Sequence, residues 1–208
     1  MRKQNCFQKI LFFSKIKSST ITQNHYDLPD QPIAMVGTPL DLIPYVRGVQ
    51  LILSGYSGYA KGKRMEVDQL VREEIIRAGG RVRSHMQNIH DTAFREDKLQ
   101  EARAAKQCME ECDMLTNDVE KSVSGMEHAF FSGQRSPSNA DLKKLIKHDH
   151  DVIDMITKAV NLANSAEHIL ATGEEDLLTV IRQTTQKMTS CRGFFGARNN
   201  VLNGLRKK

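Results

Sequence analysis

The sequence predicts an all-α protein: a bundle of about four unequal amphipathic helices, partly coiled-coil-like, behind a flexible N-terminal segment. All five prolines lie between residues 29 and 44 or at residue 137, so residues 45–136 and 138–208 contain no proline that would break a helix. Aromatic residues make up only 6% of the chain, Trp is absent and there are nine Met. This composition favours helix seams over a β-sandwich core, which is rich in aromatic and β-branched residues.

We expect three segments: a flexible or targeting segment at residues 1–37, a helical bundle domain at 38–191 and a basic C-terminal tail at 192–208. The apolar run Ile10–Phe13 is too short for the core of a secretory signal, and no stretch approaches the roughly 20 apolar residues of a membrane span. The four dispersed cysteines are read as reduced thiols. We therefore expect a cytoplasmic protein, or a mitochondrial matrix protein if residues 1–34 are a transit peptide.

The first helix is expected to begin between Thr38 and Asp41. Thr38 supplies an N-cap, Pro39 suits the first turn, and the Asp41 carboxylate complements the helix dipole. The following residues form the most apolar segment of the chain. We therefore expect Leu40–Ser54 to be largely buried against two long helices.

The glycine-containing segment Gly58–Arg64 resembles a phosphate-binding loop only superficially. The glycine spacing of a P-loop is missing, and so is the strand that should precede it. The segment is therefore read as a flexible connection between helices, with Tyr56 and Tyr59 exposed.

A helical pattern returns at Met65, pauses at Gly79 and Gly80, and then resumes for roughly 50 residues. The clearest break comes next, at Gly133–Ser138. The residues expected on the apolar face of this stretch are Phe94, Ala102, Ala105, Met109, Cys112, Val119, Met126 and Phe130.

A further long helix is predicted from Ser138 onward, because Ser138 and Asp141 have the spacing of a capping box. The residues expected on its buried face are Leu142, Leu145, Asp149, Val152, Ile156, Val160, Ala163 and Leu170.

The last predicted helix follows Thr172 and Glu175, which repeat the capping spacing. It should run from Leu177 to about Ser190 and end at Gly193. The pattern also allows a short additional helix at 200–205.

The candidate metal ligands are His148, His150, Asp151 and Asp154. On a helix, His148 pairs with Asp151 and His150 pairs with Asp154, but the two pairs point in different directions. A two-metal helical site also needs Glu-x-x-His on two helices, and this spacing does not occur in the chain. We therefore read these residues as a solvated polar face and expect no cofactor and no catalytic residue.

Charge is segregated along the chain: residues 1–26 and 177–208 contain no Asp or Glu, although the net charge is only +5. Phe194 and Phe195 lie between Arg192 and Arg198, and this combination of apolar and cationic side chains suits a lipid surface or a partner groove. The ordinary alternative is that the apolar residues close the protein's own bundle. The residues expected to contact a partner or polyanion are Lys187, Arg192, Phe194, Phe195, Arg198, Arg206, Lys207 and Lys208.

The sequence favours a non-enzymatic interaction or scaffold protein that has a protein partner and self-associates, since long helices with small apolar seams gain stability by adding helices. The first alternative is a peripheral protein that uses its basic tail on an anionic membrane or another polyanion. Nucleic acid is less favoured as that polyanion, because every acidic residue lies in the middle of the chain and would repel phosphates. A weaker alternative is a helical metal-binding enzyme.

Overall fold

The computed structural model describes residues 40–122, 128–133, 137–173 and 176–206, and within these ranges all regular secondary structure is helical. The predicted all-α fold class is confirmed, whereas the flexible segment predicted at residues 1–37 lies outside the described residues. The elements are a 3₁₀ helix η1 (Leu40–Leu42), α1 (Ile43–Gln50), α2 (Arg64–Arg95), α3 (Leu99–Lys121), α4 (Asn139–Thr172) and α5 (Leu177–Arg206). None of these helices is both long enough and apolar enough to cross a membrane.

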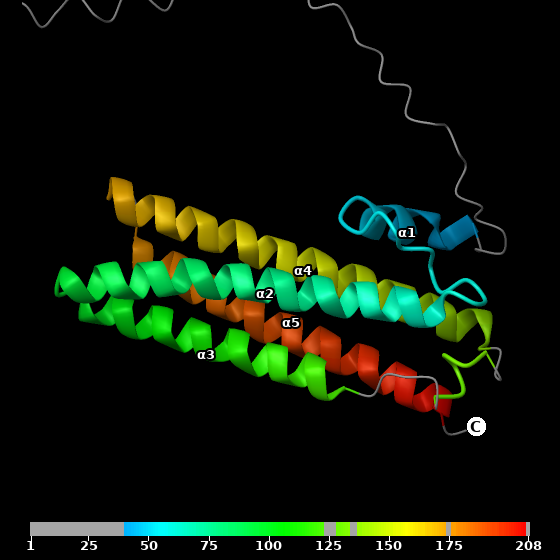
Figure 1. Ribbon diagram of the computed structural model, residues 1–208. Helices are drawn as coiled ribbons and strands as arrows, with labels where there is room; N and C mark the ends of the chain where they lie inside the picture. The colour runs from blue at the N-terminus through cyan, green and yellow to red at the C-terminus, as the bar shows by residue number, and fades with distance from the viewer. Residues whose placement is uncertain (1–39, 123–127, 134–136, 174–175, 207–208) are drawn as a thin grey trace, which may run out of the picture. The chain divides into compact units, whose positions relative to one another are not determined.

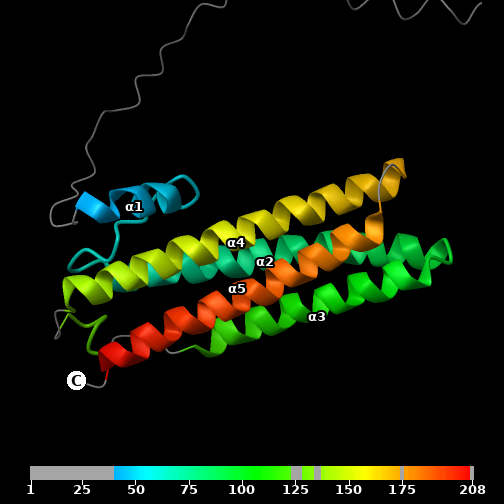
Figure 2. The ribbon, with the colours of Figure 1, turned by 180° about the vertical axis from the view of Figure 1, so that it is seen from behind.

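The four long helices form a bundle in which α2 and α4 run in one direction and α3 and α5 in the other (Figures 1 and 2). Helix α2 packs against α3 and α4, and α5 packs against the same two helices. The order around the bundle is therefore α2, α3, α5, α4. Helices α3 and α4 occupy diagonal corners although they follow each other in sequence, so the chain crosses one end of the bundle between Lys121 and Asn139.

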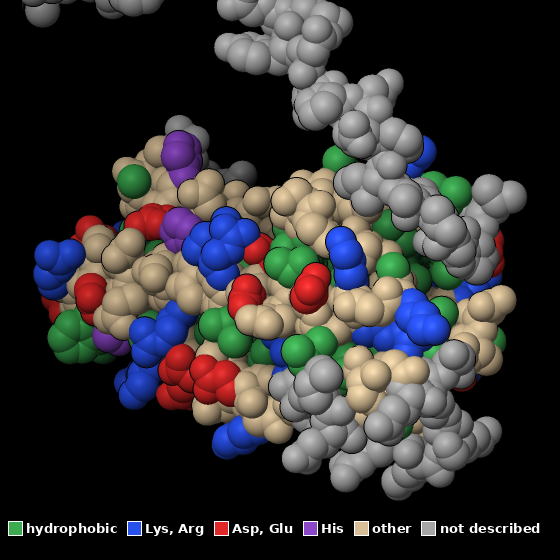
Figure 3. Space-filling view, turned by 45° about the vertical axis from the view of Figure 1, so that its right-hand side comes forward, with side chains coloured by type: hydrophobic (Ala, Val, Ile, Leu, Met, Phe, Trp, Pro, Cys, Tyr) green, Lys and Arg blue, Asp and Glu red, His purple; other side chains and the backbone are tan. Residues whose placement is uncertain are grey.

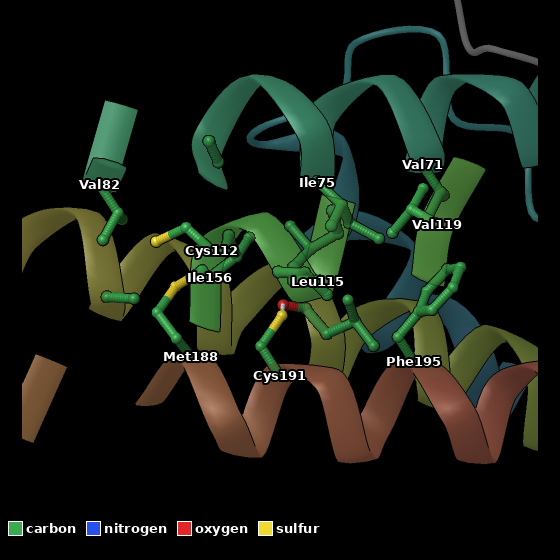
Figure 4. Close-up of a cluster of buried hydrophobic side chains, with 14 of the residues drawn as sticks. Val71, Ile75, Val82, Cys112, Leu115, Val119, Ile156, Met188, Cys191 and Phe195 are labelled. Atoms are coloured by element: carbon green, nitrogen blue, oxygen red, sulfur yellow. Dashed lines mark hydrogen bonds between the residues drawn. The ribbon is translucent and has the colours of Figure 1, made fainter. Parts of the chain in front are cut away.

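All four long helices contribute to one hydrophobic core (Figure 4). Helix α2 supplies Val71 and Ile75, which lie above Leu115 of α3, while α5 supplies Met188 and Phe195 from below. The thiols of α3 and α5 are free and buried in this core. They fill space between the helices, as small apolar side chains do.

The first helix is shorter than predicted, because α1 ends at Gln50 and packs mainly on α4. Val46 and Val49 are buried as expected. The prediction that Leu40–Ser54 is largely buried is wrong at Leu51, which is 90% exposed, and at Ile52, which is 37% exposed. These two side chains follow the last turn of α1 and border an open pocket on α4, where none of the described helices covers them.

The break in the second helical stretch is also misplaced in the prediction. Helix α2 passes through Gly79 and Gly80 and ends at Arg95, and the turn before α3 contains Asp97 with a positive φ of 57°. Gly lowers helix propensity by only about 1 kcal/mol, and packing of the helix on its neighbours outweighs this cost. As a result Phe94 is 61% exposed rather than part of the core.

The remaining residues of that predicted face are divided between helix and connection. Ala102, Ala105, Cys112 and Val119 are buried on α3, as expected. Phe130 is buried too, but it lies in the connection after α3. Met126 lies outside the described residues.

Helix α4 begins where the capping spacing predicted. The Ser138 hydroxyl oxygen accepts a hydrogen bond from the Asp141 backbone N–H at 3.1 Å, and the hydroxyl donates to the Asp141 carboxylate at 2.8 Å. Leu145, Asp149, Val152, Ile156 and Ala163 are buried on the predicted face. Gly173 ends the helix in the left-handed conformation, at φ 72°, which a glycine adopts without strain.

Helix α5 does not end at Gly193, and that prediction is wrong: the helix continues to Arg206. The Asp176 carboxylate, rather than Thr172, caps its start by accepting the backbone N–H of Thr179 at 3.4 Å. The helix continues because its apolar side chains stay in register with the core. The buried residues of this stripe are Met188, Cys191, Phe195, Leu202 and Leu205.

Because α2 is continuous through its two glycines, replacing Gly80 by Ala should stabilise the protein. Gly80 is exposed, and a Cβ atom there would meet no heavy atom within 4 Å. Gly80→Ala should therefore raise the free energy of unfolding by about 0.5–1 kcal/mol, measured by urea denaturation. A helix break at this position would instead make the substitution neutral or destabilising.

Candidate functional site

A buried ionic network surrounds Arg198, whose side chain is fully buried between α5, α2 and α4. The guanidinium Nη2 lies 2.5 Å from Oδ1 of Asp68 on α2, and Nε lies 2.5 Å from Oδ1 of Asp149 on α4. Nη2 also donates to the Tyr59 hydroxyl at 2.6 Å. A buried charge is tolerated only when it is paired and hydrogen-bonded, and Arg198 has two carboxylates as partners.

The connection between α1 and α2 is held by the same network. The Tyr56 hydroxyl donates to Oδ2 of Asp149 at 2.7 Å, and both Tyr56 and Tyr59 are buried. The prediction that these tyrosines are exposed is therefore wrong, because their hydroxyls are needed to satisfy buried charges. Tyr59 adopts a left-handed φ of 64°, a strained conformation for a bulky residue that its buried contacts maintain.

The network reaches α3 through Arg72. Its Nε lies 2.8 Å from Oδ2 of Asp68, and its Nη1 donates to the backbone carbonyl of Val119 at 2.8 Å. Asp68 thus receives one arginine on each carboxylate oxygen, Arg198 on Oδ1 and Arg72 on Oδ2. All four long helices and the connection before α2 are joined by these contacts.

The electrostatics of the network keep Arg198 charged. Burial alone would lower the pKa of its guanidinium, but interactions with Tyr59, Asp149 and Asp68 hold this pKa well above its ordinary value. Burial raises the pKa of Tyr56 and of Tyr59 well above that of a free phenol, so both hydroxyls remain protonated donors. The polar atoms that make these contacts are engaged with one another, so the network joins the helices from which they come.

The structure places the predicted contact residues of the tail within or against the bundle. Phe195 and Arg198 are buried, at 1% and 0% exposure. Arg192 pairs with Asp118 at 2.9 Å and with Glu111 at 3.1 Å on α3. Lys187 and Phe194 are half-buried on α5. The other residues predicted to make contacts are Arg206, Lys207 and Lys208. The side chain of Arg206 and the whole of Lys207 and Lys208 lie outside the described part of the chain.

The candidate metal ligands on α4 are not brought together. The His150 ring lies edge-on to Tyr45, with centroids 5.4 Å apart, and against Gly48 of α1. Asp154 pairs with Lys158 at 2.7 Å, and Asp151 lies 3.4 Å from His150 Nδ1. Nδ1 of His148 is buried without a hydrogen-bond partner. Among the described residues, no group of three or more His, Cys, Asp or Glu side chains is arranged to hold a metal ion.

An apolar step lies where α1 ends on the surface of α4, and we define it by Leu51, Ile52 and the pocket beside them. The pocket has a volume of about 320 Å³. Its lining residues are Gly48, Val49, Leu51 and Ile52 from the α1 side and His150, Ile153, Asp154 and Thr157 from α4. This step was not predicted from the sequence. The run Leu51–Leu53 is nevertheless a signal for it, because three consecutive apolar side chains cannot all face one side of a chain.

Comparisons with protein-family models, with curated proteins and with solved structures found no match to this chain.

Loss of Arg198 should strongly destabilise the fold, because Arg198→Met leaves the Asp149 carboxylate buried without its cation. We expect the free energy of unfolding to fall by about 3–5 kcal/mol, measured by urea denaturation. The matched control is Arg83→Met, which removes an exposed pair with Asp113 and should cost less than about 1 kcal/mol. Equal small losses in the two variants would show that the network does not support the bundle.

Proposed function

We propose that this chain is a non-enzymatic helical interaction or scaffold protein that self-associates through the apolar step. The observation that carries the proposal is Leu51, whose side chain is 90% exposed beside a pocket of about 320 Å³. An exposed leucine is common on protein surfaces, but a leucine next to an open pocket supplies both halves of a contact.

A second copy of the same chain fits the step because its two sides are complementary. On the α1 side, Arg47 and Leu51 are four residues apart and both are exposed, so a cation and an apolar side chain share one strip. On the α4 side, Asp154 lines the pocket and supplies a carboxylate. In a two-fold dimer, the strip that contains Arg47 and Leu51 on each copy would contact the α4 side of the pocket on the other copy. A two-fold interface uses the same surface of both chains, so this surface must be complementary to itself.

The outer part of α4 also has the composition of an interface. Between Met155 and Gly173 the helix carries only two charged residues, Lys158 and Glu167. The cores of protein interfaces are depleted in charged side chains. The surface that continues from the pocket along α4 is thus suited to a protein partner.

The buried thiols are consistent with a reducing compartment, and we propose that the protein self-associates in the cytoplasm. Cys108, Cys112 and Cys191 are free, and burial raises the pKa of the Cys191 thiol to about 12, so this sulfur is a poor nucleophile at neutral pH.

The proposal predicts a dimer that Leu51→Glu converts to a monomer. Burial of a leucine side chain is worth about 1.5–3 kcal/mol, and a two-fold interface contains two copies, so the dissociation constant should rise by at least about 100-fold. Sedimentation velocity over a range of protein concentrations measures this change. Circular dichroism should remain that of the intact protein, because Leu51 contributes little to the core.

The matched control is Phe94→Glu, which places the same charge on an exposed apolar residue at the end of α2. This variant should remain dimeric. A monomeric intact protein, or equal dissociation of both variants, would contradict self-association through the apolar step.

A further inference from the structure

Another pocket opens between α3 and α5, close to where both helices begin. Its volume is about 280 Å³. Helices α3 and α5 pack together and run in the same direction, so their first turns lie at the same end of the bundle (Figure 2). The lining residues come from one face of each helix, because they are three, four or seven positions apart on α3 and four apart on α5. They are Gln100, Arg103, Ala104 and Gln107 on α3, and Leu178 and Arg182 on α5.

The lining of this pocket carries many hydrogen-bond donors, and none of its residues is acidic. Arg103 lines it from α3 and Arg182 from α5. Each guanidinium carries five N–H donors in a planar arrangement and accepts no hydrogen bond. The side-chain amides of Gln100 and Gln107 add further donors. The polar part of the pocket is thus suited to a ligand that is negatively charged and accepts hydrogen bonds.

Neither arginine has a carboxylate partner in the described part of the chain. Arg103 and Arg182 form no ion pair there, whereas Arg192 on the same helix α5 forms two. On a helix, an arginine pairs most readily with an acid three or four residues away. At these two arginines every such neighbour is uncharged or basic: Leu99, Gln100, Lys106, Gln107, Leu178, Thr179, Thr185 and Gln186.

Acidic side chains occur near the pocket in sequence, but they do not line it. Glu101 is two positions from Arg103 and therefore lies on a different face of α3. The Asp176 carboxylate is engaged at the start of α5. Its pKa is lowered chiefly by the hydrogen bond from the Thr179 hydroxyl, and the charge of Arg182 makes only a small contribution. Both lining guanidinium groups thus keep their donors free for a ligand.

The rest of the bundle shows the usual way in which its cations are neutralised. Arg192 reaches from α5 to α3 and pairs there with Glu111 and Asp118. Over the central part of the face seen in Figure 3, acidic side chains likewise lie beside the basic ones. The pocket differs, because two like charges line it. Holding two cations at one pocket is unfavourable, and an anion bound between them would reverse the sign of this interaction.

We propose that this pocket binds the phosphate group of a small phosphomonoester. A guanidinium group matches the oxygen atoms of a phosphate with two parallel hydrogen bonds. Two arginines also match the nearly two negative charges of a phosphomonoester at neutral pH, whereas a carboxylate would balance only one of them.

The other features of the pocket fit the same ligand. Ala104 and Leu178 are half-buried and offer an apolar surface to the carbon part of a phosphomonoester. The positive ends of the α3 and α5 dipoles lie at this end of the bundle and favour an anion. The pocket shares no residue with the apolar step, and the proposal does not depend on self-association.

The test is a titration of the full chain with glycerol phosphate at constant ionic strength, followed by NMR of the arginine Nε–H groups. The signals of Arg103 and Arg182 should shift and saturate at one ligand per chain. Arg182→Gln should raise the dissociation constant by about 10-fold or more, because it removes a charged hydrogen-bond donor. Its circular dichroism should be unchanged, since Arg182 is exposed.

The matched control is Arg192→Gln, which removes the same charge from the same helix at a residue that is already paired. This variant should bind glycerol phosphate as the intact chain does. Equal weakening in both variants would overturn the proposal, because net charge alone would then explain the binding. Absence of saturable binding by the intact chain, which includes Glu174 and Glu175 outside the described residues, would overturn it too.

Two further ligands identify the anion. Acetate should bind more weakly than glycerol phosphate by about 10-fold or more, because it has one negative charge instead of two. Equal binding of acetate would contradict the assignment to phosphate. A peptide that contains phosphoserine should bind no more tightly than glycerol phosphate. Clearly tighter binding of the peptide would overturn the assignment to a small molecule and indicate a phosphorylated protein partner instead.

Discussion

The need to neutralise one buried guanidinium governs the arrangement of this protein. Arg198 has no access to water, so it requires Asp68 and Asp149 within hydrogen-bonding distance. These carboxylates come from two different helices, and Asp149 also requires the hydroxyl of Tyr56. The charge is satisfied only when α2, α4, α5 and the connection before α2 are all in place, which links the formation of these elements to one another.

This network also explains why the acid-free C-terminal region does not form a separate tail. Phe195 lies in the core one turn before Arg198, and Arg192 is paired with carboxylates of α3 on the outer side of the helix. Two cations of α5 are thus engaged within the bundle, Arg198 in its interior and Arg192 in ion pairs with α3.

Local periodicity and capping residues were enough to predict the helical class, the start of α4 at Ser138 and the buried face that contains Leu145, Asp149 and Val152. The environment of Arg198 depends instead on long-range packing. This residue lies in register with the apolar stripe of α5, but a charged residue there reads as surface unless its partners are known. Those partners lie 130 and 49 residues away along the chain, and only folding brings their carboxylates to the guanidinium. Leu51 shows the converse, because this apolar side chain remains exposed where none of the described helices packs over the end of α1.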